Sequence, residues 1–379
     1  MNYDVIVIGC GLAGATCARE LAERGGQRVL LLERRPHVGG NAYDCEDESG
    51  ILIHKYGPHI FHTNNERVYR YLSRFTDFSD YMHTVTANIH GSFIPVPFNF
   101  NSIERVFGDR APGLIKKLTD KYPEGTKIPI FELTEQNDPE LAELADYVFN
   151  NVFAHYTEKQ WGVPITEVSR ETLSRVPIFL SRDDRYFQDA YQGMPVDGYT
   201  PMFERMLDHE NIEVCLGADA KDRVRLENGA VTLDGEPFGG RVIFSGALDE
   251  LFDYCYGDLP YRTLDFGFET HDVDSFQPNG TVNYTVDMPY TRITEFKKLT
   301  GQKKPDVTTV MKEYSRACTR GDNPYYAILN EENLNLYGKY KKLADQYPSL
   351  YLVGRLAEYK YYNMDAIVAR ALELCDSLV

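Results

Sequence analysis

Three glycines near the start of the chain are spaced for binding a dinucleotide. Gly9, Gly11 and Gly14 follow residues 3–8, an apolar and β-branched run typical of a strand covered on both faces. In this pattern the first glycine permits a tight turn, the second lets the backbone approach a pyrophosphate, and the third lets a helix pack on the strand. The free N–H groups at the start of that helix, expected over residues 15–24, would face the phosphates.

An acidic residue completes this motif. The next predicted strand, residues 28–32, ends at Glu33, nineteen residues beyond Gly14. A carboxylate at this position can accept hydrogen bonds from ribose hydroxyls. Because strand, turn, helix, strand and acid occur in register, the sequence predicts a Rossmann-like unit rather than a chance glycine-rich turn.

A further pair of glycines helps to decide between NAD and FAD, the two dinucleotides that bind to this fold. Five residues separate Glu33 from Gly39 and Gly40, which would let a loop run close to the ligand. The spacing resembles the extended FAD fingerprint of the amine oxidase, phytoene desaturase and mutase group. It favours FAD over NAD.

Two histidines three residues apart raise the question of a metal site. His59 and His62 follow Pro58, which precludes a regular helix here, and no third ligand is near them in the sequence. We therefore expect contacts to a flavin or polar packing for both side chains, and no metal.

The composition argues against several classes of protein. The 379 residues are enough for two or three compact units, and a net charge of −17 repels a polyanion such as nucleic acid. Seven scattered cysteines without a CxxC pair suit a reducing cytosol better than a disulfide framework or a zinc site. The apolar residues 5–8 are too few to span a bilayer. We expect a cytoplasmic protein without membrane insertion.

The remaining patterns alternate between sheet and helix. Residues 84–97 predict a hairpin, residues 102–175 are mostly helical, and residues 261–314 predict a second sheet. One helix follows Asp138, with Leu141, Leu144, Ala145, Val148 and Phe149 on its apolar face. Further elements are expected as a helix at 201–209, a strand at 212–216, a hairpin through Asn228 and Gly229, strands at 241–244 and 350–355, and a helix at 365–378.

The predicted fold class is α/β, with a Rossmann-like FAD-binding domain assembled from separated segments, a helical lid domain and an antiparallel β-sheet domain. The FAD-binding domain would comprise residues 1–83, 199–258 and 326–379. The β-sheet domain would comprise residues 84–100, 176–198 and 259–325, and the lid residues 101–175.

Four blocks of the sequence resemble bacterial UDP-galactopyranose mutases. In chain order they are residues 56–63 (YGPHIFHT), 156–162 (YTEKQWG), 290–295 (YTRITE) and 354–362 (GRLAEYKYY). They occur in the family's order, and the likeness runs essentially end to end. It implies an enzyme that interconverts UDP-galactopyranose and UDP-galactofuranose without net redox change, by attack of reduced flavin N5 on the galactose anomeric carbon.

The resemblance also assigns roles to single residues. Arg175 and Arg292 would grip the diphosphate, as bidentate guanidinium groups can, and His62 would lie near the isoalloxazine, so that these three are the catalytic candidates. The implied substrate contacts are Phe153, Tyr156, Thr157, Trp161, Arg175, Tyr186, Asn283, Arg292, Tyr326 and Tyr361. The implied cofactor contacts are Gly9, Gly11, Leu12, Ala13, Gly14, Glu33, Arg34, Gly40, Asn41, His59, Ile60, Gly354, Arg355, Asn363 and Met364.

Two positions depart from the family pattern. Asn363 stands where the family commonly has aspartate, and Phe179 stands where many relatives carry arginine, which leaves open whether Arg182 or Arg185 compensates. The resemblance further implies a homodimer, NAD(P)H or another reductant, and a place in the biosynthesis of cell-surface polysaccharides.

Two other functions share the opening fingerprint. An FAD-dependent oxidoreductase of the amine oxidase or desaturase type would need an apolar substrate tunnel, and a non-catalytic nucleotide sensor would need only the fold. The YTEKQWG and YTR blocks argue against the first. The two arginines and the aromatic set argue against the second.

Overall fold

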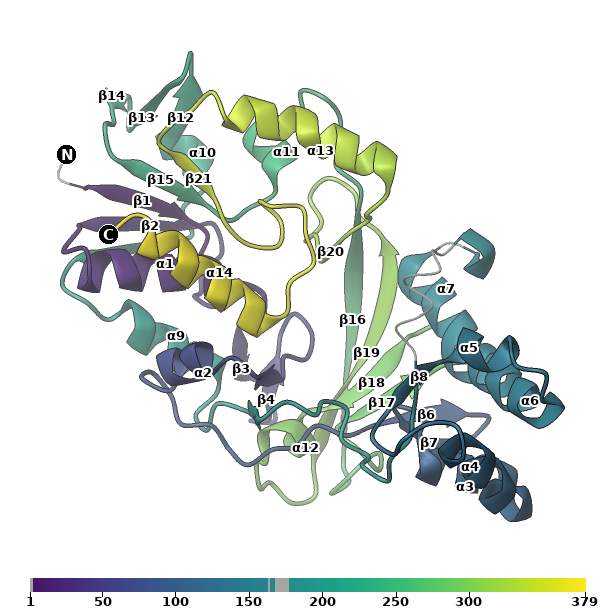
Figure 1. Cartoon of the computed structure of the whole chain (residues 1–379). Helices are drawn as coiled ribbons and strands as arrows, with labels where there is room; N and C mark the ends of the chain where they lie inside the picture. The colour runs from purple at the N-terminus through teal and green to yellow at the C-terminus, as the bar shows by residue number, and fades with distance from the viewer. Residues whose placement is uncertain (1–2, 163, 168–176) are drawn as a thin grey trace.

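The computed structural model describes residues 3–162, 164–167 and 177–379. These residues form a parallel sheet wrapped by helices, a long antiparallel sheet, and a group of helices on the far side of that second sheet (Figure 1). No helix among them is both long and apolar enough to cross a membrane.

A five-stranded parallel sheet forms the first part. Its central strand is buried along its whole length because both faces of the sheet are covered. Val5 and Val7 pack into the core under one layer of helices, whereas Ile6 and Ile8 pack into a second core on the opposite face. The strands in their order across the sheet are β11 (Ile212–Leu216), β2 (Val29–Glu33), β1 (Val5–Ile8), β15 (Arg241–Phe244) and β21 (Leu350–Leu352).

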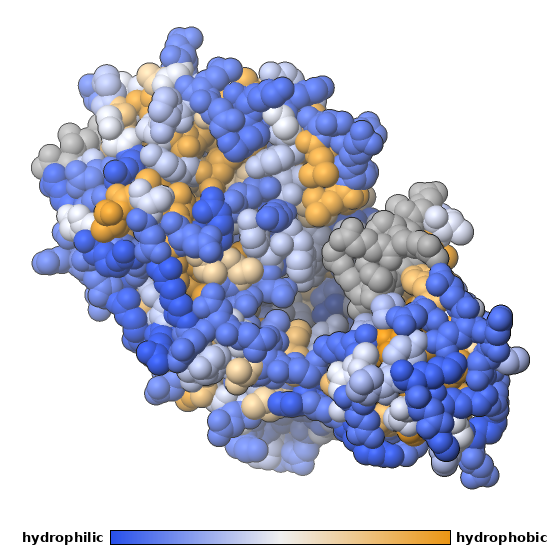
Figure 2. All heavy atoms as spheres, viewed as in Figure 1, coloured by the Kyte–Doolittle hydropathy of each residue, from blue (hydrophilic) through white to orange (hydrophobic). Residues whose placement is uncertain are grey.

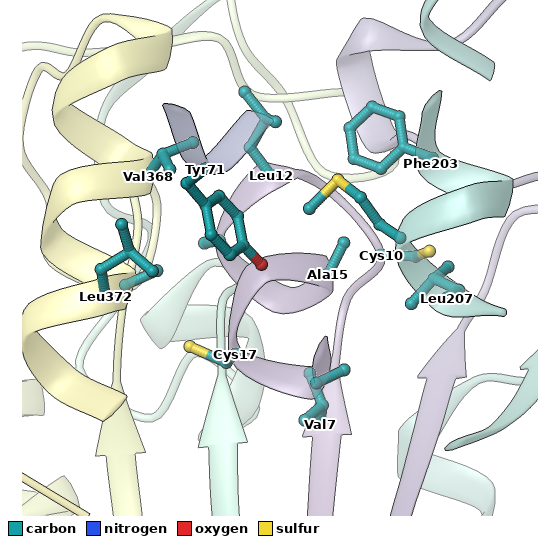
Figure 3. Close-up of a cluster of buried hydrophobic side chains, with 14 of the residues drawn as sticks. Val7, Cys10, Leu12, Ala15, Cys17, Tyr71, Phe203, Leu207, Val368 and Leu372 are labelled. Atoms are coloured by element: carbon teal, nitrogen blue, oxygen red, sulfur yellow. The ribbon is translucent and has the colours of Figure 1, made fainter. Parts of the chain in front are cut away.

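Three helices from distant parts of the chain cover one face of this sheet. They are α1 (Leu12–Glu23), α9 (Tyr199–Leu207) and α14 (Met364–Asp376). Figure 3 shows Cys17, Phe203 and Leu372, one side chain from each helix, converging on the same core. Burial of a side chain the size of leucine or phenylalanine contributes about 1.5–3 kcal/mol. The parallel-sheet part is therefore held together by segments that are far apart in sequence.

The other face carries smaller elements. An antiparallel ribbon packs there through Val224, Val231 and Leu233. It consists of β12 (Val224–Glu227), β13 (Ala230–Leu233) and β14 (Glu236–Pro237). Beside it, α13 (Glu331–Ala344) packs against the short α11 (Leu248–Leu251).

A seven-stranded sheet forms the second part, and its two longest strands stand between the parallel sheet and the distal helices (Figure 1). All neighbours are antiparallel except β17 and β6. The strands in order are β20 (Tyr326–Ala327), β16 (Tyr261–His271), β19 (Thr308–Ala317), β18 (Arg292–Glu295), β17 (Thr281–Tyr284), β6 (Val85–Ile89) and β7 (Ser92–Val96).

The distal helices pack against this sheet and form with it a separate apolar core. Asp138 caps one of them by accepting hydrogen bonds from the N–H groups of Glu140 and Leu141. The helices are α3 (Phe100–Phe107), α4 (Ala111–Thr119), α5 (Ile130–Thr134), α6 (Pro139–Val148), a π-helix (Phe149–Ala154) and α7 (His155–Trp161). The strands β8 (Lys127–Pro129) and β9 (Pro177–Phe179) pair beside them.

Short elements complete the described chain. They are β3 (Asp44–Glu46), β4 (Leu52–His54), β5 (Phe61–Thr63), β10 (Tyr191–Gly193), α2 (Glu66–Leu72), α10 (Ala220–Arg223), α12 (Phe296–Thr300), and 3-10 turns at Gly40–Ala42, Gly108–Arg110 and Ile165–Glu167.

The predicted fold class is confirmed, with corrections at single elements. The predicted strands at 212–216 and 241–244 match β11 and β15, but the first helix begins at Leu12, because Gly11 already serves as its N-cap. Phe149, predicted on the apolar face of α6, begins the π-helix that follows. Its side chain is half-buried and packs against the same apolar core as that face.

Candidate active site

A cavity of about 790 Å³ joins the two sheets. It begins at the carboxyl ends of β1 and β2 and reaches residues of β17, β18 and β19. In Figure 2 the molecular surface is largely hydrophilic and is hollowed between the parallel-sheet part and the distal helices. Cavities of this volume are typical of ligand sites.

The two glycine motifs meet at one end of the cavity. A Cβ added at Gly40 would lie 2.9 Å from the Cα atom of Gly11, and one added at Gly14 would lie 1.9 Å from the carbonyl oxygen of Gly9. The Gly39 N–H donates to the Cys10 carbonyl at 3.0 Å, which ties the two turns together. The result is a cradle of bare backbone that a pyrophosphate can approach.

Glu33 ends β2 beside this cradle. The side chain is buried, and its two oxygens accept hydrogen bonds from the N–H groups of Cys10 at 2.8 Å and Arg35 at 2.9 Å. Because Glu33 also lines the cavity, the carboxylate both fixes the glycine turn and offers its remaining lone pairs to a ligand.

The other end of the cavity is built around Arg292, on β18. Its Nη2 donates to the Tyr156 hydroxyl at 2.5 Å, and its Nε lies 3.5 Å from Oε1 of the buried Glu313 on β19. That separation is too long for a hydrogen bond, so the buried Nε–H has no hydrogen-bond partner among the described residues.

The charge of this arginine is secured by its neighbours. Burial lowers the pKa of Arg292, but the negative charge of Glu313 and the nearby phenol oxygens raise it more, so the net shift is upward. Burial also raises the pKa of Tyr156 to about 12. A half-buried cation with a buried, unpaired Nε–H, close to phenol hydroxyls, is suited to bind an anionic group.

Comparison with known proteins identifies the family. The model of the UDP-galactopyranose mutase family matches residues 151–361, and that of the NAD(P)-binding Rossmann-like domain matches residues 7–75. A probable UDP-galactopyranose mutase of Klebsiella pneumoniae is 36% identical over 100% of this chain and 95% of its own length. The chain belongs to the UDP-galactopyranose mutase family.

Within that family the nucleotide sugar varies. The dTDP-fucopyranose mutase of Escherichia coli is also 36% identical, over 97% of this chain and 96% of that protein. A crystal structure of reduced UDP-galactopyranose mutase matches the fold with a TM-score of 0.74 at 16% identity, covering 100% of this chain and 94% of that one. Solved oxidoreductases match at 12 to 14% identity and so share the fold alone. The chain is an enzyme of the isomerase class with a cofactor of the flavin type.

The predicted cofactor residues lie together at the glycine end. All of them except Gly14 line the cavity, and Gly14 instead allows α1 to approach β1. The guanidinium of Arg34 pairs with Glu250 at 2.7 Å, and that of Arg355 lies 5.1 Å from the Tyr361 ring centre. The glycine end of the cavity is thus continuous with the ring of Tyr361.

The predicted substrate residues divide into two sets. Those that line the cavity are Tyr186, Asn283, Arg292, Tyr326 and Tyr361. Tyr156 and Trp161 contact residues of this first set. The Tyr156 hydroxyl accepts a hydrogen bond from Arg292, and the ring centre of Trp161 lies 6.5 Å from that of Tyr326. Phe153 and Thr157 are buried beside Tyr156, and Arg175 lies outside the described residues.

Helix α7, which carries Tyr156 and Trp161, is docked onto the seven-stranded sheet. The Lys159 ammonium donates to the carbonyls of Tyr284, Met288 at 3.0 Å and Tyr290 at 3.4 Å. The Gln160 carbonyl accepts from Arg262 at 3.1 Å and from the hydroxyl of Ser315 at 2.6 Å. These contacts position the aromatic residues of α7 against the end of the cavity that contains Arg292.

The departures from the family pattern have different outcomes. Phe179 is buried, and neither Arg182 nor Arg185 lines the cavity: they pair with Glu104 at 2.6 Å and Asp183 at 2.7 Å. Neither arginine therefore replaces the missing one at this site. Asn363 does line the cavity, at the N-cap of α14.

The two histidines of the HxxH pattern have separate environments. Burial lowers the pKa of His59 to about 3, and its Nδ1 lies 2.9 Å from the Gly57 carbonyl. His62 stacks on Phe187, with ring centres 3.6 Å apart. No cluster of three or more metal-ligating side chains occurs in residues 3–162, 164–167 and 177–379.

Several residues near the cavity were not predicted from the sequence. They are Glu313, His83, Phe187 and Asp189, of which the first three line the cavity. None of them carries a clear local signal: Glu313, for example, lies between Lys312 and Tyr314 in the predicted sheet region. His83 is buried against Tyr81, whose hydroxyl lies 2.9 Å from its Nδ1, and burial lowers its pKa to about 3.

Proposed function

We propose that this chain interconverts UDP-galactopyranose and UDP-galactofuranose with FAD in its reduced form as the cofactor. One observation carries the proposal: a single cavity connects the bare glycine cradle to the unpaired guanidinium N–H of Arg292. A nucleotide sugar bound at the second end would place its sugar toward a flavin bound at the first.

FAD fits the residues present. The close approach of Gly11 and Gly40 leaves room for a pyrophosphate against backbone N–H groups, and Glu33 faces the same space. When bound, reduced flavin supplies a nucleophilic nitrogen that can attack an anomeric carbon. The side chains of the protein then need only bind the nucleotide sugar, orient it and neutralise the charge of its diphosphate.

Those side chains lie where a diphosphate leaving group would develop charge. Arg292 supplies the cation, and Tyr186, Tyr326 and Tyr361 supply hydroxyl groups along the cavity wall. Burial raises the pKa of Tyr186 and of Tyr326, so both remain neutral and able to donate hydrogen bonds. Fixed donors of this kind stabilise a departing anion. We assign Arg175 the same role on the strength of its family spacing.

A second substrate is favoured by the dTDP-fucopyranose mutase relative, which is as similar to this chain as the Klebsiella protein. The same cavity chemistry would then act on a nucleoside diphosphate 6-deoxyhexose. We further propose, from family membership, a homodimer in the cytoplasm that takes its electrons from NAD(P)H or another reductant. The oxidoreductase alternative has only a shared fold to support it.

The deciding assay compares substrates and redox states. The purified protein is loaded with FAD, reduced with dithionite or left oxidised, and given UDP-galactofuranose or dTDP-fucofuranose, with pyranose formation followed by chromatography. We expect UDP-galactopyranose to form only with the reduced protein. Faster conversion of the dTDP sugar would move the proposal to the second substrate, and oxidase turnover without isomerisation would refute both.

A further inference from the structure

The carboxylate of Asp189 is hydrogen-bonded to both His62 and Asn64. Its Oδ2 lies 3.0 Å from Nδ1 of His62, and its Oδ1 accepts from Nδ2 of Asn64 at 2.6 Å. The Asn64 Oδ1 in turn accepts from the N–H of Ala190 at 2.9 Å. The backbone donor therefore fixes which way the Asn64 amide faces, and that amide fixes one carboxylate oxygen of Asp189.

The surrounding backbone holds this arrangement in place. Strand β5, which carries His62, pairs with β10 so that His62 lies opposite Gln192. The Gln192 side chain donates to the carbonyls of Phe187 at 3.0 Å and Asp189 at 3.1 Å. Phe187 stacks against the imidazole at an interplanar angle of 12°. Position and ring plane of His62 are thus set by residues of one short loop.

The carboxylate determines where the imidazole proton resides. An ionised carboxylate can only accept hydrogen bonds, so Nδ1 of His62 must be the donor to Asp189. In the neutral ring the other nitrogen, Nε2, then carries a lone pair and no proton. His62 lines the cavity, which makes Nε2 the nitrogen available to a bound ligand.

We propose that Asp189 is a positioning residue that fixes His62 in the Nδ1-protonated tautomer, so that Nε2 accepts a hydrogen bond from an N–H or O–H of the ligand in the cavity. The identity of that ligand rests on the proposed function, whereas the tautomer does not. The tautomer can therefore be tested without any turnover.

Asp189→Asn is expected to invert the tautomer. Asn64 still presents its Nδ2–H to position 189, so the new amide must turn its only oxygen toward Asn64 and its NH2 group toward His62. A donor facing Nδ1 makes that nitrogen the acceptor and moves the proton to Nε2. The same inversion accompanies the Asp-to-Asn change in the serine protease triad.

Exchanging the two side chains supplies the matched control. In Asp189→Asn/Asn64→Asp, the carboxylate at position 64 accepts from the Ala190 N–H and from the amide NH2 at position 189. The amide oxygen at position 189 is then free to accept from His62 Nδ1. The double variant has the net charge of the parent and the original tautomer, so it separates tautomer from charge and from packing.

The experiment records histidine ring ¹⁵N spectra of the FAD-loaded protein, with the His62 signals assigned from His62→Gln, and steady-state kinetics of the reduced protein. We expect Nδ1–H in the parent, Nε2–H in Asp189→Asn, and Nδ1–H again in the exchanged variant. We expect kcat to fall about tenfold in Asp189→Asn with KM nearly unchanged, and to recover in the exchanged variant, as for loss of one hydrogen bond.

Each outcome decides the matter. Nε2–H in the parent overturns the proposal even if the single variant fails to fold. An unchanged tautomer in Asp189→Asn, or a kcat that stays low in an exchanged variant with normal flavin content and the Nδ1–H tautomer, also overturns it. If no UDP sugar is turned over at all, the proposed function fails while the spectra still test Asp189.

Discussion

The two ends of the cavity are built in different ways. At the flavin end the ligand surface is mostly backbone, supplied by two glycine turns that lie within forty residues of each other. At the substrate end it is mostly side chain, supplied by β18 and β19 and by the loop that carries Tyr186, with α7 behind Arg292. The first end is specified by what is absent, a Cβ atom. The second is specified by charges and hydroxyls brought together from distant segments.

This difference predicts how each end fails. Added bulk at the flavin end displaces backbone and should remove the cofactor together with stability. Loss of a side chain at the substrate end should reduce turnover and leave both the fold and the flavin in place. Four measurements test the contrast, beginning with the largest expected effect.

Gly14→Ala should abolish flavin binding. Its Cβ would lie 1.9 Å from the Gly9 carbonyl, so β1 and α1 must separate, at a cost of about 1–3 kcal/mol of folding free energy or more. Flavin content by visible absorbance and urea unfolding measure the two effects. Gly113→Ala, which meets nothing within 4 Å and lies on the exposed face of α4, is the control and should keep the flavin content of the parent and at least its stability. A yellow, fully stable Gly14→Ala protein would refute the close approach.

Arg292→Ala should lower kcat by about 10²–10³ while flavin content stays normal, because a charge that stabilises the leaving diphosphate is lost. Steady-state isomerisation and visible spectra measure both. Arg110→Ala removes an exposed arginine paired with Glu143 at 2.5 Å, outside the cavity, and should leave turnover unchanged. Normal turnover in Arg292→Ala would remove it from the site.

Acid should destabilise both ends together. Burial lowers the pKa of His54 to about 4 and of His59 and His83 to about 3, from 6.5 in the unfolded chain. The unfolded state therefore binds more protons below pH 6.5, and stability present above that pH is lost as the pH falls toward 4. Each histidine contributes about 1.4 kcal/mol per pH unit in this window. Urea unfolding at pH 7.5, 6 and 5 measures the slope. A free energy of unfolding that does not change with pH would contradict the burial of these histidines in their neutral form.

Tyr156→Phe should have the smallest effect, about a threefold to tenfold loss of kcat/KM. The change removes one hydroxyl that accepts from Arg292 and keeps the aromatic face. Tyr256→Phe changes an exposed ring and serves as the control. A Tyr156→Phe enzyme as efficient as the parent would show that the Tyr156–Arg292 bond does not orient the guanidinium.

The contrast also explains what could be predicted from the sequence. Gly9, Gly11, Gly14 and Glu33 are a local motif, so the cofactor end follows from spacing alone. The strand β15 was predictable because a buried parallel strand is a continuous apolar run, and the edge strand β11 was predictable because its first apolar residues alternate with a charged one. Arg292 and Tyr156 were assigned through family resemblance, since no local pattern tells that residues 136 apart share a hydrogen bond. The division of the chain into seven domain segments stays a prediction.

Asp189 and Glu313 could not be predicted from the sequence. The role inferred for Asp189 depends on pairing between β5 and β10, two strands of three residues each, which carry almost no periodic signal. Glu313 is buried on β19 because Arg292 lies opposite it on the neighbouring strand. Both residues owe their position to tertiary contacts, which spacing in one sequence does not encode.

The central claim is that one cavity holds the flavin and the nucleotide sugar side by side. Its most direct test is a titration of the oxidised, FAD-loaded protein with UDP-galactopyranose, followed by the visible flavin absorbance and, in parallel, by calorimetry. We predict a saturable shift of the flavin band that follows binding and is lost in Arg292→Ala at unchanged flavin content. Binding seen by calorimetry without any flavin shift, and with equal affinity in Arg292→Ala, would contradict the account.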